Sequence, residues 1–325
     1  MKTRIVFMFS GQGSQYAGMG QELYQHHPVF RRCMDEFSEV AFPFLGIHLA
    51  EKICVSGGDS DSEVFFHTRY TNPALYMFNY AVAATLEAMG IIPDSLLGYS
   101  LGELTAAAYN GTVNRFDLFV RLIRASVSLE QYAPDGGMLA ILDSSQIRDW
   151  YPDWFNGTSL ASVNCTRNFV VSGPATVLDE LQGKLQGKDI LYQRLPVVQA
   201  FHSPWIEPAR AAVFRELDDL VLSDRGRVPL YSCATPGVEE TSTHPRRFWD
   251  ALRQPVLFEM ALRHLETEES SLYIDVGPSG TLAAFAKLSL TPGSLSQAIP
   301  VVDRFGLNQR GLQNARVKAA VWQTS

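Results

Sequence analysis

Residues 98–102 of the chain read Gly-Tyr-Ser-Leu-Gly, between the apolar residues 96–97 and a segment, 103–110, whose residues favour a helix. A G-x-S-x-G pattern between a strand and a helix predicts a nucleophile elbow. This turn holds its serine, here Ser100, in strained geometry. In such a turn the serine hydroxyl is exposed at a helix N-terminus, and the following amide can point at an oxyanion. Because so short a pattern also arises by chance, the interpretation depends on finding a partner base elsewhere.

The composition argues against several classes of function. The chain has 325 residues and a net charge of −7 with no long basic run, which argues against a nucleic-acid partner. Residues 1–7 enter an apolar strand directly, without the features of a signal peptide. No apolar stretch approaches the roughly 18–20 residues of a membrane span. The cysteines form no C-x-x-C pair and so predict neither a zinc site nor a disulfide framework: Cys33, Cys54, Cys165 and Cys233. We therefore expect a cytoplasmic protein with no membrane partner, no metal and no bound organic cofactor.

Strands and helices alternate through much of the chain. The predicted elements are a strand over 5–9, a core helix over 72–89, a strand at 96–97, helices over 103–110 and 115–131, and strands over 228–232 and 271–276. This alternation predicts an α/β fold with a parallel sheet covered by helices. The tail after residue 292 has weak periodicity, and we expect it to pack loosely or to serve contacts.

The middle of the chain has a different order of elements. Strands are predicted over 138–142, 159–165, 169–172 and 190–195, with helices over 144–154 and 174–186. The resulting order β-α-β-β-α-β is that of a ferredoxin-like unit. We therefore predict a ferredoxin-like small subdomain, 134–195, inserted into a large α/β-hydrolase-like catalytic subdomain formed by 1–133 and 196–325.

A serine hydroxyl is a poor nucleophile until a base takes its proton, so the chain must supply a histidine. Of its seven histidines, His202 is the candidate, because it follows the point where the small subdomain returns to the large one. Such crossings commonly form the wall of a cleft. The alternative is that His202 is a partly buried loop histidine without a catalytic role.

Several motifs occur together in one order along the chain. They are 11–15 (Gly-Gln-Gly-Ser-Gln), 98–103, Arg124 and 200–204 (Ala-Phe-His-Ser-Pro), with further matches at 70–75, 253–256 and 275–278. This combination resembles the malonyl-CoA:acyl-carrier-protein transacylases, a family that includes the acyltransferases of polyketide synthases. The resemblance extends over roughly residues 4–290 and is far more specific than the elbow alone.

The resemblance implies roles for the matching residues. Ser100 is expected to be the acylated nucleophile and His202 its general base, oriented by a main-chain carbonyl near Gln254 rather than by a carboxylate. The backbone amides of Gln12 and Leu101 are expected to form the oxyanion hole. Without the resemblance, Gln12 could equally be a plain turn residue in a glycine-rich loop.

Two side chains are expected to select the acyl group. Arg124 could hold the free carboxylate of a malonyl group through two parallel hydrogen bonds, and Phe201 could close the pocket against a branched acyl chain. The alternatives are an exposed helix arginine, since Arg121 lies one turn earlier, and a core aromatic residue.

Four positions depart from the family pattern. Tyr99 stands where the family usually has His, Asn72 where it has Gln, Cys233 where it has Asn, and Ser10 where Pro is common. Three of the four are expected at the active site, which suggests a retuned pocket. Such a pocket could accept a different acyl chain, with Tyr99, Asn72 and Cys233 contacting it, or could admit water to the acyl-enzyme.

Two functions within the family follow. In the first, which Arg124 favours, Ser100 takes a malonyl-type group from coenzyme A and passes it to the phosphopantetheine thiol of an acyl carrier protein. In the second, the acyl-enzyme is released to water, so that the protein is an acyl hydrolase clearing stalled carrier proteins. Two further hypotheses are a catalytically silent scaffold and a generic esterase with Asp143 as its third catalytic residue.

Overall fold

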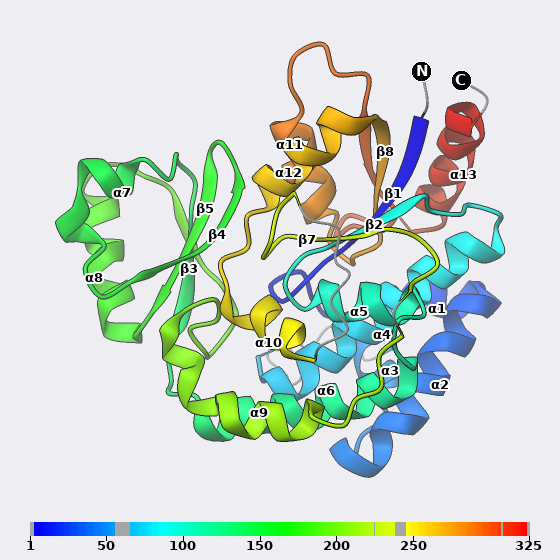
Figure 1. The fold of residues 1–325 in the computed structure, drawn as a ribbon, viewed down its shortest axis with the longest axis horizontal. Coiled ribbons are helices and arrows are strands. Elements are labelled where there is room, and N and C mark those ends of the chain that lie inside the picture. Colours follow the sequence, from blue (N-terminus) through cyan, green and yellow to red (C-terminus); the bar gives the residue numbers. More distant parts are fainter. Residues whose placement is uncertain (1–2, 56–65, 224, 238–244, 307, 324–325) are drawn as a thin grey trace.

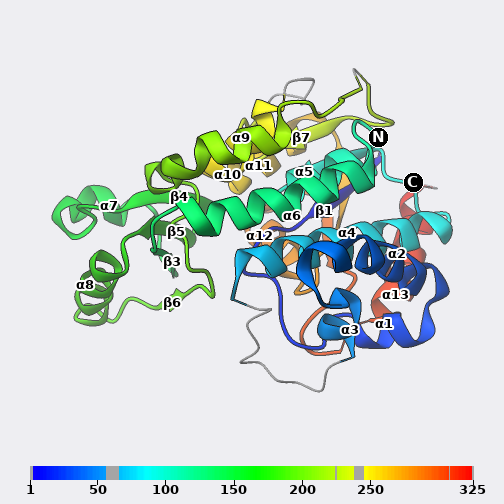
Figure 2. The ribbon, with the colours of Figure 1, turned by 90° about the horizontal axis from the view of Figure 1, so that it is seen from below.

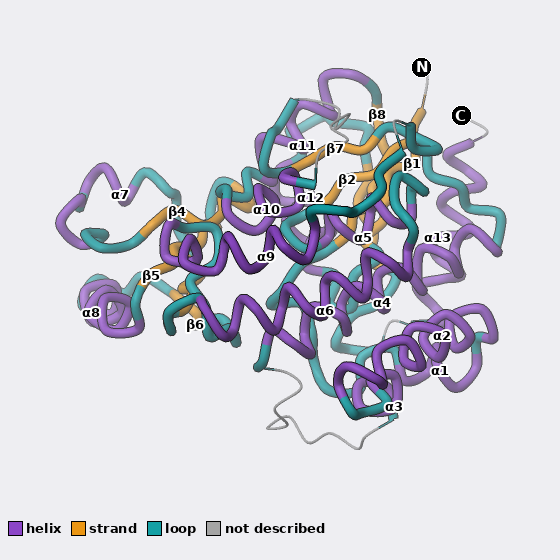
Figure 3. The backbone as a smooth tube through the Cα atoms, turned by 60° about the horizontal axis from the view of Figure 1, so that its bottom comes forward, coloured by secondary structure: helices purple, strands orange, loops and turns teal. Residues whose placement is uncertain are grey.

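Two β-sheets divide the chain into a large lobe and a small lobe (Figure 1). The computed structural model describes residues 3–55, 66–223, 225–237, 245–306 and 308–323. Figure 3 shows the strands of the two sheets as separate groups. No helix in the described ranges is both long and apolar enough to cross a membrane.

The sheet of the large lobe is parallel throughout. Its strands, in spatial order, are β7 (Leu230–Ser232), β2 (Ser95–Gly98), β1 (Thr3–Phe9), β8 (Ser270–Asp275) and β9 (Gln297–Pro300). Successive side chains of β1 face opposite sides and are buried on both, as expected for a parallel sheet covered by helices. The parallel α/β fold predicted from the sequence is therefore confirmed.

Helices cover both faces of this sheet. They are α1 (Gln21–His26), α2 (Pro28–Leu45), α3 (Leu49–Cys54), α4 (Thr68–Ala88), α5 (Gly102–Tyr109), α6 (Arg115–Tyr132), α9 (Arg210–Leu217), α10 (Arg246–Arg253), α11 (Phe258–Glu268), α12 (Thr281–Ser289) and α13 (Gln309–Gln323). Helices α2, α4 and α6 pack in series, and α9 runs along α6 (Figure 2). On the other face, α11 and α12 pack against β1 and β8.

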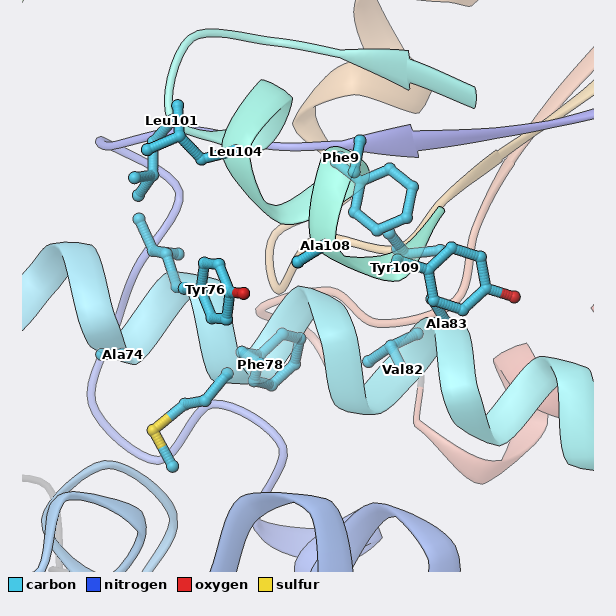
Figure 4. Close-up of a cluster of buried hydrophobic side chains, with 14 of the residues drawn as sticks. Phe9, Ala74, Tyr76, Phe78, Val82, Ala83, Leu101, Leu104, Ala108 and Tyr109 are labelled. Carbon is cyan, nitrogen blue, oxygen red and sulfur yellow. The ribbon is translucent and has the colours of Figure 1, made fainter. Parts of the chain in front are cut away.

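The elbow rests on a hydrophobic cluster between β1, α4 and α5. Figure 4 shows Phe9 from β1 beside Tyr109 from α5, with Phe78 and Val82 of α4 below them. The ring centroids of Phe9 and Tyr109 are 5.6 Å apart. Alanines fill much of α5, so the helix can approach α4 and the sheet closely and the turn before it is held firmly.

The small lobe has the predicted β-α-β-β-α-β order. Its elements are β3 (Gly137–Ile141), α7 (Ile147–Trp150), β4 (Ser159–Cys165), β5 (Asn168–Gly173), α8 (Ala175–Gln186) and β6 (Tyr192–Arg194). The strands form an antiparallel sheet in the order β4-β5-β3-β6, which is the ferredoxin-like order. The helix predicted over 144–154 is shorter than expected. It ends before Pro152, where a 3-10 turn begins, because proline lacks the amide that would continue the helix.

Of the two expectations for the tail after residue 292, loose packing is wrong. Strand β9 extends the large sheet beside β8, and α13 packs beside β1 (Figure 1). The side chains of Leu312, Ala315 and Ala319 are buried in the main core. The strand is only four residues long, which is too short to show a clear hydrophobic period.

The approach of α5 to β1 yields a stability prediction. A Cβ at Gly102 would collide with the backbone carbonyl of Phe9, so Gly102→Ala should lower the free energy of unfolding by about 1–3 kcal/mol. Gly183→Ala is the matched control, because a Cβ there meets nothing on the surface of α8. It should raise stability by about 0.5–1 kcal/mol. Urea denaturation of both variants tests this, and equal effects would contradict it.

Candidate active site

Ser100 lies in a sharp turn between β2 and α5. Its φ of 54° is in the left-handed region, which a residue with a side chain seldom adopts. The turn is closed by hydrogen bonds from the Gly102 amide to the Tyr99 carbonyl, 2.9 Å, and from the Glu103 amide to the Ser100 carbonyl, 2.9 Å. The nucleophile elbow predicted from the motif is therefore present, with Ser100 at the N-terminus of α5.

The structure brings His202 to Ser100. The Ser100 Oγ and His202 Nε2 atoms are 2.8 Å apart, although the residues are 102 positions apart in sequence. Both residues are buried, with relative exposures of 7% and 5%. His202 also has a positive φ, 58°, and its amide donates to the Leu252 carbonyl at 3.0 Å. A hydroxyl and an imidazole in this arrangement can exchange a proton directly.

The other ring nitrogen of His202 lies against a backbone carbonyl. The distance from Nδ1 to the Gln254 oxygen is 2.7 Å. Because a carbonyl can only accept, Nδ1 carries the proton and Nε2 is free to accept from Ser100. Asp143 instead accepts a hydrogen bond from the amide of Ser144. The esterase hypothesis, which needs Asp143 against His202, is therefore not supported.

Burial decides the charge of His202. Removal from water lowers the pKa of the imidazole to about 4, and the hydrogen bond to Gln254 opposes only part of this shift. The side chain is therefore neutral near pH 7, as a general base must be. A neutral imidazole also supplies no positive charge to a bound ligand.

The glycine-rich loop after β1 runs against the elbow. A Cβ at Gly11 would lie 2.9 Å from the Tyr99 carbonyl and 3.0 Å from the Ser100 Cβ, so only glycine allows this approach. The side chain of Gln12 donates to Thr71 at 2.9 Å, which anchors the loop to α4. Gln12 and Leu101 both line the pocket beside the Ser100–His202 pair. The oxyanion role of their amides stays a prediction, and the N-terminus of α5, which begins at Gly102, favours negative charge nearby.

Two cavities meet at this site. A pocket of about 40 Å³ is formed around Ser100 and His202, and a cavity of about 550 Å³ lies next to it, between the lobes. Of the predicted site residues, the small pocket has five others on its wall: Gln12, Asn72, Tyr99, Leu101 and Phe201. Asn72 donates from Nδ2 to the Ser126 hydroxyl at 2.9 Å, which ties the start of α4 to α6.

Arg124 does not reach the site, so the expectation that it grips a substrate carboxylate is corrected. Its side chain is exposed, and its guanidinium lies over the ring of Phe44 at 5.3 Å. Ser126, two positions later, is buried against Asn72. Two positions in a helix are about 200° apart, so Arg124 faces away from the pocket.

Cys233 is also displaced from its expected role. It is buried at the end of β7, and its amide lies 3.3 Å from the Gly98 carbonyl and 3.2 Å from Glu103 Oε1. It does not line either of the two cavities. Cys233 therefore supports the elbow from the side and does not contact the space beside Ser100.

Sequence reasoning missed the contribution of the small lobe. Asn164 and Asn168 line the larger cavity, while Ser162 and Met138 line the small pocket. The hydroxyl of Tyr99 donates to Asn164 Oδ1 at 2.8 Å. The available signal was the pair of asparagines near the gap between the strands predicted over 159–165 and 169–172, but nothing in the sequence indicated that these strands face the elbow.

Comparison with known proteins identifies the family of the chain. A family profile described as the acyl transferase domain matches residues 6–324. The chain belongs to the acyl transferase family. A similar protein, the polyketide biosynthesis acyltransferase homolog PksD of Bacillus subtilis, is 36% identical to this acyltransferase over 305 residues, 94% of this chain and 93% of that protein.

Solved structures of two kinds resemble this acyltransferase: acyltransferase domains of polyketide synthases and an MCAT. The acyltransferase domain from module 8 of the salinomycin polyketide synthase matches with a TM-score of 0.87 and 27% identity, over 99% of this chain and 77% of that one. The MCAT from Streptococcus pneumoniae matches with a TM-score of 0.79 and 26% identity, over 98% and 100%. The family predicted from the sequence is therefore confirmed, and the protein is an acyltransferase of the type found in polyketide biosynthesis.

The lowered pKa of His202 predicts an unusual pH profile for the acyltransferase. Since the pKa is about 4, the neutral base persists below the usual range. The rate of Ser100 labelling by a fluorophosphonate should therefore stay level from pH 8 to about 5 and fall only as the pH approaches the folded pKa. Circular dichroism at each pH separates this fall from unfolding. A midpoint near 6.5, the ordinary histidine value, would contradict the prediction.

The position of Arg124 predicts that its replacement has little effect. Because the guanidinium lies over Phe44 on the surface, Arg124→Ala should change stability by about 0.5–1 kcal/mol at most. The second-order rate constants for acylation by malonyl and acetyl thioesters should each stay within about two-fold of the wild type. A selective loss of about ten-fold or more in the rate constant for malonyl thioester would show that Arg124 does bind the substrate carboxylate.

Proposed function

We propose that Ser100 accepts a neutral acyl group from the phosphopantetheine thioester of an acyl carrier protein and that the acyl-serine is then released to water. This is the hydrolase alternative rather than malonyl transfer from coenzyme A, which Arg124 favoured at the level of sequence. The pairing of Ser100 with a neutral His202 supports the acyl-serine, and a neutral acyl group is supported by a small pocket whose described wall has no permanently charged cation.

The first half of the reaction forms the acyl-enzyme. His202 Nε2 accepts the Ser100 proton as Oγ bonds to the thioester carbon, and the oxyanion faces the amides of Gln12 and Leu101. The carbon–sulfur bond breaks, and His202 returns the proton to the departing thiol. In the second half, His202 accepts a proton from water as its oxygen attacks the ester. Ser100 then leaves with that proton and the free acid is released.

The lining of the site supports a neutral acyl group. Among the described residues that line the two cavities, the side chain with a permanent positive charge is that of Arg304, in the larger cavity, where it lies over Tyr16 at 5.4 Å. The small pocket has none. Burying the carboxylate of a malonyl group there without a partner would cost several kcal/mol. An acetyl or similar group carries no such cost.

The proposal of a carrier protein as acyl donor rests on similarity to other members of the family. The salinomycin synthase domain and the MCAT share this fold over nearly the whole chain, and PksD is described by its part in polyketide biosynthesis. The larger cavity opens between the lobes and is lined by residues from both. It is of the size that a flexible thioester arm needs. The proposed chemistry uses the side chains and amides of this chain and no resident cofactor.

A comparison of acyl donors tests the proposed function. Acetyl and malonyl groups are supplied on a carrier protein and on coenzyme A, and the acyl-serine, free acid and transfer product are measured by mass spectrometry. We expect acetyl carrier protein to acylate Ser100 and to be hydrolysed. Ser100→Ala should abolish this reaction, and His202→Ala should slow it roughly 100-fold or more. Malonyl should react at least about ten-fold more slowly.

Two outcomes would contradict the proposal. Rapid loading of malonyl from coenzyme A, followed by transfer to a carrier protein with little free acid, would restore the malonyl transferase. Absence of any acyl-serine, together with no fluorophosphonate labelling of Ser100, would favour the silent scaffold.

A further inference from the structure

Four residues lie on the walls of both cavities and so form the boundary between them: Gln12, Tyr99, Val170 and Leu195. Gln12 and Tyr99 come from the large lobe, and Val170 and Leu195 come from the small-lobe side. The boundary is therefore completed only when the lobes are packed together. Tyr99 is the largest of the four and is adjacent to the nucleophile.

The two cavities differ greatly in size. A water molecule needs about 10–15 Å³ of such space, so the small pocket of about 40 Å³ holds roughly three atoms of that size. This is the size of an acyl group of two or three carbons. The cavity of about 550 Å³ is more than ten times larger, and it suits the long arm that delivers the thioester.

Tyr99 is fixed at both ends. Its amide donates to the Phe9 carbonyl at 3.0 Å, and its hydroxyl donates to Asn164 Oδ1 at 2.8 Å. Asn164 is buried on β4, and its Nδ2 donates in turn to Asn168 Oδ1 at 2.8 Å. This chain of donors fixes the orientation of the Asn164 amide, which presents its oxygen to Tyr99.

The phenol remains a donor at all relevant pH values. Burial raises the pKa of Tyr99 to about 12, so the hydroxyl keeps its proton. The ring packs toward Phe258, with the centroids 6.0 Å apart. Moving the ring aside would therefore break the contact with Asn164 and leave a buried amide oxygen without its donor.

We propose that Tyr99, held by Asn164 from the small lobe, limits the acyl group to two or three carbons by narrowing the boundary between the small pocket and the larger cavity. The inference rests on the proposed acyl-enzyme chemistry and names the substrate class for it. A longer chain exceeds the small pocket of about 40 Å³ and has to extend past the boundary with the larger cavity, where Tyr99 is the largest side chain.

The test is a series of thioesters with acyl chains of two to eight carbons on the same pantetheine arm. For the wild type, we expect the second-order rate constant for acylation of Ser100 to fall about ten-fold or more between three and six carbons. Tyr99→Ala opens the boundary and should raise the ratio of the six-carbon to the two-carbon rate constant about ten-fold. Tyr99→Phe keeps the ring but loses the tie to Asn164 and should raise the same ratio several-fold.

Control variants distinguish an effect of Tyr99 on acyl-chain length from general damage to the protein. Tyr132→Ala removes the same side chain from an exposed position on α6 that lines neither cavity, and it should leave the ratio unchanged. A Tyr99→Ala variant that lowers both rate constants by one factor would overturn the inference. An unchanged ratio in Tyr99→Phe would overturn the part assigned to Asn164.

The same series of thioesters distinguishes failure of the chain-length proposal from failure of the proposed function. If no thioester of any length acylates Ser100 in the wild type, the acyl-enzyme proposal fails. If acyl-serine forms equally well at all chain lengths, the acyl-enzyme proposal is supported and the chain-length limit assigned to Tyr99 is wrong. Thermal unfolding of each variant shows whether it is folded at the assay temperature.

Discussion

The backbone carbonyl of Gln254 accepts a hydrogen bond of 2.7 Å from His202 Nδ1, and the chemistry of the site depends on this contact. It places the proton on Nδ1, so that Nε2 can accept from Ser100 at 2.8 Å. A carbonyl brings no full charge, so it orients the imidazole without raising its pKa as far as a carboxylate would. Burial then keeps the imidazole neutral, and the pair can exchange a proton without a third acidic residue.

The position of Gln254 depends in turn on both lobes. Just beyond it, the Val256 amide donates to the Ala161 carbonyl at 2.9 Å, and the Val163 amide donates to the Val256 carbonyl at 2.9 Å. These bonds join the segment to β4 of the small lobe. On its other side, Arg253 pairs with Glu207 at 2.7 Å. Packing of the small lobe therefore helps to position His202 and also forms part of the pocket beside Ser100.

The charges around the site are consistent with one another. His202 is neutral, the small pocket has no permanent cation on its described wall, and Arg124 lies on the surface. The polar contacts at the boundary are instead uncharged, as between Tyr99 and Asn164. In the proposed reaction, such a site stabilises the negative charge that develops on the oxyanion beside the N-terminus of α5.

Local patterns in the sequence determined the elbow that holds Ser100 and the βαββαβ order. Each depends on residues close in sequence and on the period of apolar side chains. In the elbow, for example, Gly102 follows Ser100 by two positions. Only the tertiary structure decided the helix phase that turns Ser126 inward and Arg124 outward, the burial of the C-terminal strand and helix, and the meeting of Tyr99 with Asn164. These features depend on how elements far apart in sequence pack, and no local period carries that information.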